Sequence, residues 1–411
     1  MTQTAPKTRA PILRGESGLI FLTAVLAAGL TGPGQTIGVS VFIDHFVEDL
    51  ALSRPLVSTA YLIGTLTGAL FLPSVGRFID RHGVRRAQII IGLLFAGALV
   101  NMSLVQGFVT LAIGFVGIRF LGQGSLSLIT TVTVSLRFVQ NRGTALGLYS
   151  TINAGSLALA PLVLAGVIAW VGWRQAWVVA AVVIAFTVAP LAYFGLAKMP
   201  TSSAEAQLTS SDSDAYGFTR SEALRTRGFW ILTSISTTAG MLATALNFHQ
   251  IDLLQEAGLS ATAAAGMFLP QVIGSTASGF AFGVLLDRVG GRYLPAVSIA
   301  LLALAHLLGA LAAPGVRVFA YAIVLGAASG AIRTVSSALL PKWFGTANLG
   351  EIQGTMTLIG VAGTAVGPVV LALLEQRLGS YPPAIRILGL IPVAVAVFAL
   401  LPPFGHDRVS T

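Results

Sequence analysis

Two kinds of residue are scarce in this 411-residue chain: cysteine is absent, and charged residues make up only 9% of it. The absence of cysteine excludes disulfide bonds and thiolate metal sites. Soluble domains carry about 25% charged residues, so this chain has too little charge to cover a water-facing surface. Hydrophobic residues make up 55% of the sequence, which indicates an integral membrane protein.

Motifs of several other protein classes are also missing. The chain has no Gly-x-x-x-x-Gly-Lys-Ser/Thr motif, so ATP hydrolysis has no obvious site. No histidine cluster or nucleophile–base pair occurs at a useful spacing, so we expect no enzyme activity, no metal and no cofactor. The formal net charge is +9, but the basic residues are scattered between apolar runs, which argues against nucleic acid as a partner.

Long apolar runs dominate what is present. A helix needs about 20 residues to cross the hydrocarbon core of a membrane, and twelve runs reach that length. They predict an all-α membrane protein with twelve transmembrane helices in two six-helix halves. The expected spans cover residues 17–43, 54–76, 87–106, 109–136, 143–170, 175–197, 229–254, 262–286, 293–312, 317–341, 351–375 and 384–403.

The distribution of lysine and arginine orients these spans. If both termini are cytoplasmic, 17 of the 24 basic residues lie on the inner side and 5 on the outer side, with Arg119 and Arg333 inside spans. Cytoplasmic loops carry an excess of Lys and Arg, so this orientation is favoured. The predicted divisions are a cytoplasmic tail (1–16), an N-terminal bundle (17–197), a cytoplasmic linker with a short amphipathic helix (198–228), a C-terminal bundle (229–403) and a second tail (404–411).

One charged motif occurs twice, about half a chain apart. Each copy follows a long apolar run and reads Gly-x-x-x-Asp-Arg, with a further Gly and Arg close behind. The aspartate can accept hydrogen bonds from helix N-termini, and the glycines allow close packing and a tight turn. Such a repeat indicates a transporter built from two related, pseudo-symmetric halves. The two copies contain Gly76, Asp80, Arg81, Gly83 and Arg85, and Gly283, Asp287 and Arg288.

These loops resemble the motif between spans two and three, and its weaker copy between spans eight and nine, of major facilitator superfamily (MFS) transporters. The resemblance covers nearly the whole chain and includes an Arg-x-x-x-Gln-Gly motif at Arg119, Gln123 and Gly124. It implies the MFS fold, a cytoplasmic latch made by the repeated loop, and coupling or gating by Arg119 and Gln123. The alternatives are a solvated loop that only fixes topology, and an Arg119 that braces its helix through backbone carbonyls.

Within the superfamily, residues 218–230, 247–260 and 344–354 resemble bacterial relatives of the monocarboxylate and oxalate–formate transporters. This resemblance implies a monomeric multi-pass protein of the bacterial inner membrane, in contact with membrane lipids. Those carriers commonly place an arginine in span eight, whereas residues 262–286 contain no Arg or Lys. Span five also matches the Gly-rich antiporter motif only in part, because Ala160 stands where the motif has a glycine.

Few polar groups lie inside the spans, and they are the candidates for a substrate site. Pro33, flanked by two glycines, predicts a break in the first span that turns Gln35 toward a central cavity. Span seven offers Asn247, His249 and Gln250. Histidine titrates near neutral pH, so His249 is expected to carry a proton or bind a carboxylate. The plainer alternatives are a kink with Gln35 bonded to a carbonyl, and a histidine that only forms interfacial hydrogen bonds.

Arg333 lies roughly four helical turns inside span ten. Its guanidinium suits an oxyanion, and no acidic residue lies deep in a span to pair with it. The alternative is that Arg333 braces its helix, or pairs with Asp252 or Asp44 when an outer gate closes. Asp44 and Asp252 are themselves expected to serve coupling or gating.

These features together predict a secondary active transporter that moves a small, monocarboxylate-like organic anion by alternating access, coupled to protons. Its partners would be the anionic small molecule and protons. The alternative function is drug/proton antiport. The incomplete Gly-rich motif of span five and the lack of a deep carboxylate for a cationic drug argue against this alternative.

Overall fold

The computed structural model describes residues 15–138, 142–199, 217–289, 291–345 and 349–403. These residues are helical apart from short connections and one isolated β-bridge between Gly217 and Gly345. Within them, eleven helices are long and apolar enough to cross a membrane, and Leu294–Gly309 is a shorter apolar helix. The predicted all-α membrane fold is confirmed, and the shorter helix Leu294–Gly309 lies within the predicted span 293–312.

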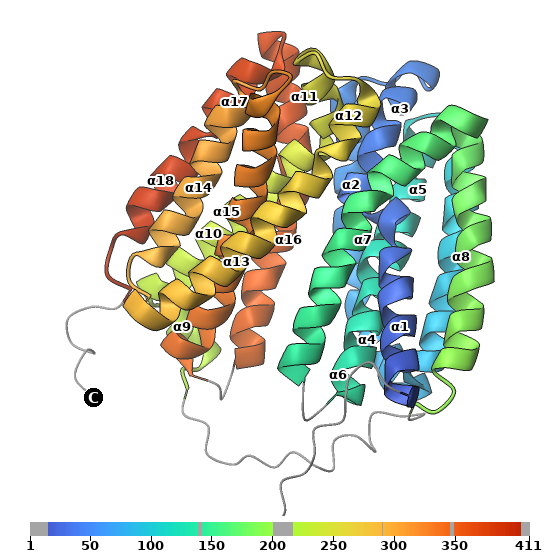
Figure 1. The fold of residues 1–411 in the computed structure, drawn as a ribbon, viewed down its shortest axis with the longest axis horizontal. Helices are drawn as coiled ribbons and strands as arrows, with labels where there is room; N and C mark the ends of the chain where they lie inside the picture. Colours follow the sequence, from blue (N-terminus) through green and yellow to red (C-terminus); the bar gives the residue numbers. More distant parts are fainter. Residues whose placement is uncertain (1–14, 139–141, 200–216, 290, 346–348, 404–411) are drawn as a thin grey trace, which may run out of the picture.

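The first half of the chain forms one bundle (Figure 1). Its first span is interrupted, and its second and third spans are both parts of α4. The elements are α1 (Gly15–Gly29), η1 (Gly32–Gly34), α2 (Thr36–Val39), η2 (Ser40–Phe42), α3 (Ile43–Asp49), α4 (Arg54–Ser103), α5 (Phe108–Ile118), η3 (Arg119–Leu126), α6 (Ser127–Arg137), α7 (Arg142–Val171) and α8 (Trp173–Gly195).

The second half forms the other bundle, preceded by the short helix α9 (Figure 1). The predicted tails and most of the predicted linker fall in 1–14, 200–216 and 404–411, which lie outside the described residues. The elements are α9 (Arg220–Leu224), α10 (Arg227–Phe248), α11 (Gln250–Glu256), α12 (Ala261–Gly266), α13 (Phe268–Val289), α14 (Leu294–Gly309), α15 (Val316–Phe344), α16 (Leu349–Leu378), α17 (Tyr381–Leu388) and α18 (Leu390–Ala399).

Each bundle has its own apolar core, and a few apolar side chains pack across between them. In the first bundle, Phe42 stacks on Trp177 with ring centroids 4.0 Å apart. Phe248, at the end of α10 in the second bundle, packs into this first core against Tyr61, with centroids 4.5 Å apart. Aromatic pairs of this kind contribute about 1 kcal/mol beyond the area they bury. Phe248 therefore helps to hold the two bundles together.

Helices α13 and α15 approach each other at backbone distance. A Cβ atom at Gly330 would lie 2.1 Å from the carbonyl oxygen of Ser275, so only glycine fits at this crossing. Small residues at helix crossings allow such close packing in membranes. The crossing fixes Ser275 beside the helical turn that carries Arg333.

The two bundles are closest at one end of the molecule. In Figure 1 they meet at the end that carries α3, α11 and α12, and they diverge toward the end that carries α6 and α9. We call the first the gate end and the second the linker end. At the gate end, α11 contacts η2, and α12 contacts α7. The excess of Lys and Arg in the predicted inner loops predicts that the linker end faces the cytoplasm.

Candidate substrate site and gate

A cavity of about 490 Å³ lies between the two bundles. The first bundle contributes a mainly apolar wall from α2 and α7, and the second contributes α10, α13 and α15. This volume lies within the range of about 300–1,000 Å³ typical of small-molecule sites. We call it the central cavity; its polar lining from the second bundle includes Asn247, Gln271, Ser275, Thr276, Ser329 and Arg333.

Arg333 supplies the only charge among the described residues that line the central cavity. Its side chain is exposed there, and one Nη2–H donates to the Ser275 hydroxyl at 2.7 Å. In the part of the chain that the structure describes, no carboxylate lies within ion-pair distance of Arg333. The alternative pairing of Arg333 with Asp44 or Asp252 is not found, because another arginine occupies both.

Asn247 lines the same cavity, and its Oδ1 is buried without a hydrogen-bond partner among the described residues. An unpaired buried acceptor costs about 1–3 kcal/mol, so this atom favours a ligand that carries a donor. Gln35, His249 and Gln250, the other predicted substrate residues, do not line the central cavity. Gln250 is buried and accepts from Gln271 at 2.5 Å.

The first span is broken at the predicted place. After η1, Gln35 adopts an extended backbone (φ −84°, ψ 154°) before α2 begins. Gln35 Nε2 donates to the Thr31 hydroxyl at 2.9 Å and lies 3.4 Å from that of Ser127. It is not among the residues that line the central cavity, so the geometry favours the plainer interpretation of Gln35 as a local hydrogen bonder.

Arg119 lies against this break and is 5% exposed. Its guanidinium donates to the carbonyl of Gly34 at 3.2 Å and to the hydroxyl of Thr65 at 3.0 Å. It also lies 4.5 Å from the ring centroid of Tyr61. These contacts match the bracing interpretation of Arg119. Gln123, one turn away in the π-helix η3, keeps a buried Oε1 without a described partner.

A second cluster of charges joins the bundles at the gate end. Arg54, the first residue of α4, places Nη2 2.9 Å from Asp44 Oδ1 and 2.6 Å from Asp252 Oδ1. Asp44 belongs to α3 of the same bundle, whereas Asp252 belongs to α11 of the other. We call these three residues the gate cluster. It brings together Asp44 and Asp252, two of the predicted coupling residues, through an arginine that was not among the predicted site residues.

Asp252 lies beyond the span Arg227–Phe248. Burial raises the pKa of its carboxyl group, and the nearby charges of Asp44 and Glu256 add to this, while the Arg54 guanidinium opposes it. The net direction is upward, so Asp252 takes up a proton at a higher pH than an ordinary aspartate.

His249 is buried behind the gate cluster, away from the central cavity. Its Nε2–H donates to the carbonyl of Pro368 at 3.0 Å, and its Nδ1 lies 3.3 Å from the Tyr381 hydroxyl. Ser58 of the first bundle lies 3.5 Å from Nε2. Because a buried imidazolium without a carboxylate partner is costly, these surroundings favour a neutral ring that fixes the gate.

The repeated loops lie at the linker end, and the structure describes them in part. Gly83 has φ 74°, which forms the turn inside α4 and favours glycine. The close packing expected at Gly76 is not found, because an added Cβ would meet nothing within 4 Å. The side chains of Asp80 and Asp287 lie outside the described residues, so the latch stays a prediction. The remaining latch candidates are Arg81 and Arg288, which are exposed, Arg85, which is half-buried, and Gly283.

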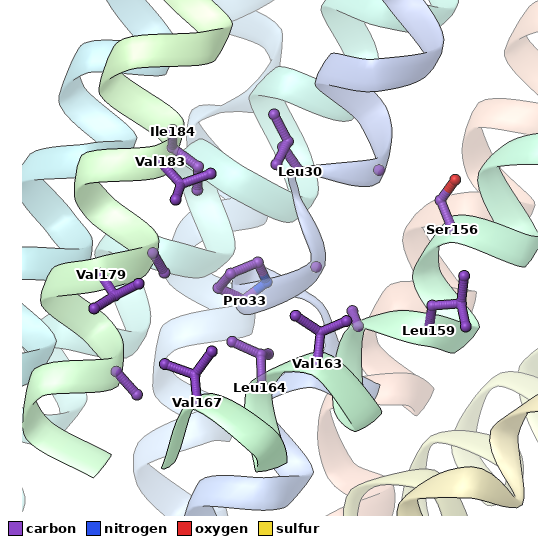
Figure 2. Close-up of a pocket in the computed structure, with 15 residues that line it drawn as sticks. Leu30, Pro33, Ser156, Leu159, Val163, Leu164, Val167, Val179, Val183 and Ile184 are labelled. Atoms are coloured by element: carbon purple, nitrogen blue, oxygen red, sulfur yellow. The ribbon is translucent and has the colours of Figure 1, made fainter. Parts of the chain in front are cut away.

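Another cavity, of about 250 Å³, lies within the first bundle. Figure 2 shows Pro33 at the break of the first span, facing Val163 and Val167 of α7 and Val183 of α8. Among the described residues of the lining, Ser156 supplies the only polar side chain. Because this cavity touches one bundle alone, rocking of the bundles would not expose it alternately to the two sides.

The geometry is that of a two-bundle transporter with a central site, and sequence comparison agrees. A profile of the Major Facilitator Superfamily matches residues 19–314 and 249–409. The chain belongs to the major facilitator superfamily. Members of this superfamily are multi-pass membrane transporters.

Two curated MFS relatives are bacterial. The uncharacterized MFS-type transporter YcxA of Bacillus subtilis (strain 168) is 22% identical over 289 residues, which cover 67% of this chain and 66% of YcxA. The uncharacterized MFS-type transporter Rv1877 of Mycobacterium tuberculosis (strain ATCC 25618 / H37Rv) is 25% identical over 439 residues, which cover 92% of this chain and 63% of Rv1877. The chain thus spans slightly less than two thirds of the length of these relatives.

Solved MFS structures share the fold. A bacterial homologue of the human lysosomal transporter Spinster, in an inward-facing and occupied conformation, superposes with a TM-score of 0.74 at 15% identity, covering 94% of this chain and 96% of that one. The nucleoside transporter NupG gives a TM-score of 0.74 at 16% identity, covering 93% and 98%. At these identities the likeness shows the MFS fold alone.

Sequence reasoning missed two residues of the central cavity and one of the gate cluster. Gln271 and Ser275 lie four residues apart on α13, so a polar i, i+4 pair within an apolar span was the available signal. Arg54 carried a weaker signal, an arginine at the start of a span that follows an acidic segment. Its pairing with Asp252, 198 positions away, required the fold.

Proposed function

We propose that this MFS protein is a proton-coupled transporter of small organic anions, resembling the monocarboxylate and oxalate–formate branch. The observation that carries the proposal is Arg333, a guanidinium exposed in the central cavity with no described carboxylate partner. A guanidinium binds a carboxylate through two parallel hydrogen bonds. Asn247 and Gln271 would receive the polar groups of the substrate, and the apolar wall from α7 its hydrocarbon part.

The gate cluster supports transport by alternating access. It ties the bundles together on the side opposite the linker, while the bundles diverge at the linker end (Figure 1). With the linker end in the cytoplasm, this is an inward-facing arrangement. Opening toward the outside would require Arg54 to release Asp252, and the bundles would then rock about the central cavity.

Proton coupling fits Asp252 better than His249 in this structure. Asp252 is part of the contact that must break, and its pKa is raised. Protonation would remove its charge and weaken the ion pair with Arg54. A proton taken up from the outer side would therefore favour the outward-facing state, in which this contact is broken and the central cavity opens to the outer side.

The test is uptake into proteoliposomes that contain the purified full chain. A panel of radiolabelled organic anions, from monocarboxylates to hydroxy- and dicarboxylates, would be offered with and without an inwardly directed pH gradient. We expect at least one anion to accumulate, and the gradient to accelerate it. Arg333→Ala serves as the loss-of-function variant, and Arg317→Ala, an exposed arginine at the start of the same helix, serves as its matched control.

Drug/proton antiport is the second candidate outcome of this assay. A cationic drug needs a carboxylate in the cavity, and none is found among the described residues that line it. If cationic dyes are exported against a proton gradient while no organic anion moves, the anion proposal fails.

A further inference from the structure

A pocket of about 260 Å³ at the linker end is separate from the central cavity and the gate cluster. It lies between the turn of α4 and the end of α8, within the first bundle. Its polar lining consists of His82, Arg85, Arg86 and Tyr193. No carboxylate is among the described residues that line it, so the pocket is strongly basic.

Arg85 is held in this pocket without a counter-charge among the described residues. Its guanidinium carbon lies 4.6 Å from the ring centroid of Tyr193, and its Nε is buried with no described hydrogen-bond partner. Stacking on the ring holds the guanidinium plane in place. The buried Nε–H is a donor that the described protein atoms leave unused. It would be satisfied by an acceptor that enters the pocket.

Glu16, a described acid that contacts Lys198 at this end, is already engaged. Glu16 accepts from Lys198 at 3.1 Å and lies 3.8 Å from Arg137. Arg86 and His82 are exposed. His82 Nδ1–H donates to the carbonyl of Phe78 at 3.2 Å. Three groups that can carry positive charge therefore face one pocket, and none has a described acidic partner.

The position of the pocket selects its ligand. Arg85 and Arg86 lie in the first turns of the span Arg81–Ser103, and Tyr193 lies near the end of the span Trp173–Gly195. The pocket is therefore at the level of the lipid headgroups. Tyr193 and the neighbouring Phe194 are 55% and 72% exposed, as is typical of aromatic residues at a membrane interface. Basic pockets between spans on the cytoplasmic side suit anionic headgroups.

We propose that this pocket binds the phosphodiester headgroup of an anionic phospholipid from the cytoplasmic leaflet. The phosphate oxygens accept from the Arg85 and Arg86 guanidinium groups, and the acyl chains extend along the lipid-facing side of α8. The bound lipid links the turn at Gly83 to the end of α8. This assignment is independent of the transported substrate, because the pocket touches only one bundle.

The test compares lipids on the delipidated full chain in detergent. Native mass spectrometry and thermal stability would be measured with phosphatidylglycerol and with phosphatidylcholine, for the wild type and for R85Q/R86Q. R220Q/R225Q is the matched control, because it removes the same charge from exposed residues of α9 and its C-cap at the same end. Each basic residue near the leaflet contributes a factor of roughly five in affinity, so R85Q/R86Q should bind phosphatidylglycerol roughly thirtyfold more weakly.

Retention of tight phosphatidylglycerol binding by R85Q/R86Q, or an equal loss in R220Q/R225Q, would overturn the proposal. Equal binding of phosphatidylcholine by the wild type would also overturn it, since that lipid has no net charge. Inorganic phosphate and glycerol phosphate distinguish a soluble anion site: if either stabilises the wild type as strongly as the lipid does, the lipid assignment fails. Should the double variant misfold, R86Q alone alters only an exposed side chain and should still weaken lipid binding roughly fivefold.

Discussion

Replacing Arg54 with Gln should open the gate end. Arg54 contacts Asp252 of the other bundle at 2.6 Å, with side-chain exposures of 20% and 25%. Its contact with Asp44 stays within one bundle, so it is present in both states and cancels. Fully exposed ion pairs contribute about 0–1 kcal/mol, and hydrogen bonds to charged groups about 1.5–3 kcal/mol. For this half-buried pair we expect about 1–2 kcal/mol, which is a shift of roughly five- to thirtyfold toward the outward-facing state.

The shift can be measured as a distance across the gate end. Because the chain has no cysteine, spin labels can be attached at Glu48→Cys on α3 and Thr262→Cys on α12, both exposed and in different bundles. Pulsed electron paramagnetic resonance should show mainly a short distance in the wild type. In Arg54→Gln, a longer distance should gain population by the expected factor. Asp252→Asn should shift the distance distribution as much as Arg54→Gln does, and Asp44→Asn should shift it clearly less.

Two results would refute this reasoning. One is an unchanged distance distribution in Arg54→Gln, which would show that the ion pair does not bias the two states. The other is an equal shift in Asp44→Asn and Asp252→Asn, because the contact within one bundle would then matter as much as the contact between bundles.

Three further predictions follow from the structure. Asp252→Asn should flatten the pH dependence of uptake, because the raised pKa lets Asp252 take up a proton at a higher pH than an ordinary aspartate. His249→Gln should slow uptake but keep the pH profile, and the reverse pattern would make His249 the proton carrier. Asp80→Asn should slow transport with little change in substrate affinity, and a large loss of affinity would argue against a latch. Cysteine at Ser221 should react with membrane-impermeant maleimide only from the cytoplasm, and labelling in intact cells would reverse the topology.

The spans and their order could be read from the sequence because apolar length alone determines them. The break at Pro33 was also predictable, since proline between two glycines cannot continue a helix. The close crossing of α13 and α15 at Gly330 was not, because a glycine in an apolar run does not show which helix it will meet.

The candidate site was predicted only in part, for a related reason. Arg333 and Asn247 were found because a polar group inside an apolar run is conspicuous, and they line the same cavity. His249 and Gln250 are equally conspicuous in the sequence, but the end of α10 turns both into buried hydrogen-bonded positions. Arg54 was missed because its role depends on Asp252, which only the packing of α11 against the first bundle brings near.

The central claim is that Arg333 holds an anionic substrate, and the most direct test is the binding of the transported anion to Arg333 variants. With the wild type, Arg333→Ala and Arg333→Lys compared by isothermal titration calorimetry, the account predicts measurable affinity for the wild type, weak affinity for Arg333→Lys and none for Arg333→Ala, while Arg317→Ala binds normally. Lysine keeps the charge but loses the two parallel hydrogen bonds of the guanidinium. Near-normal affinity in Arg333→Ala, in a protein that is correctly folded by its thermal stability, would contradict the account.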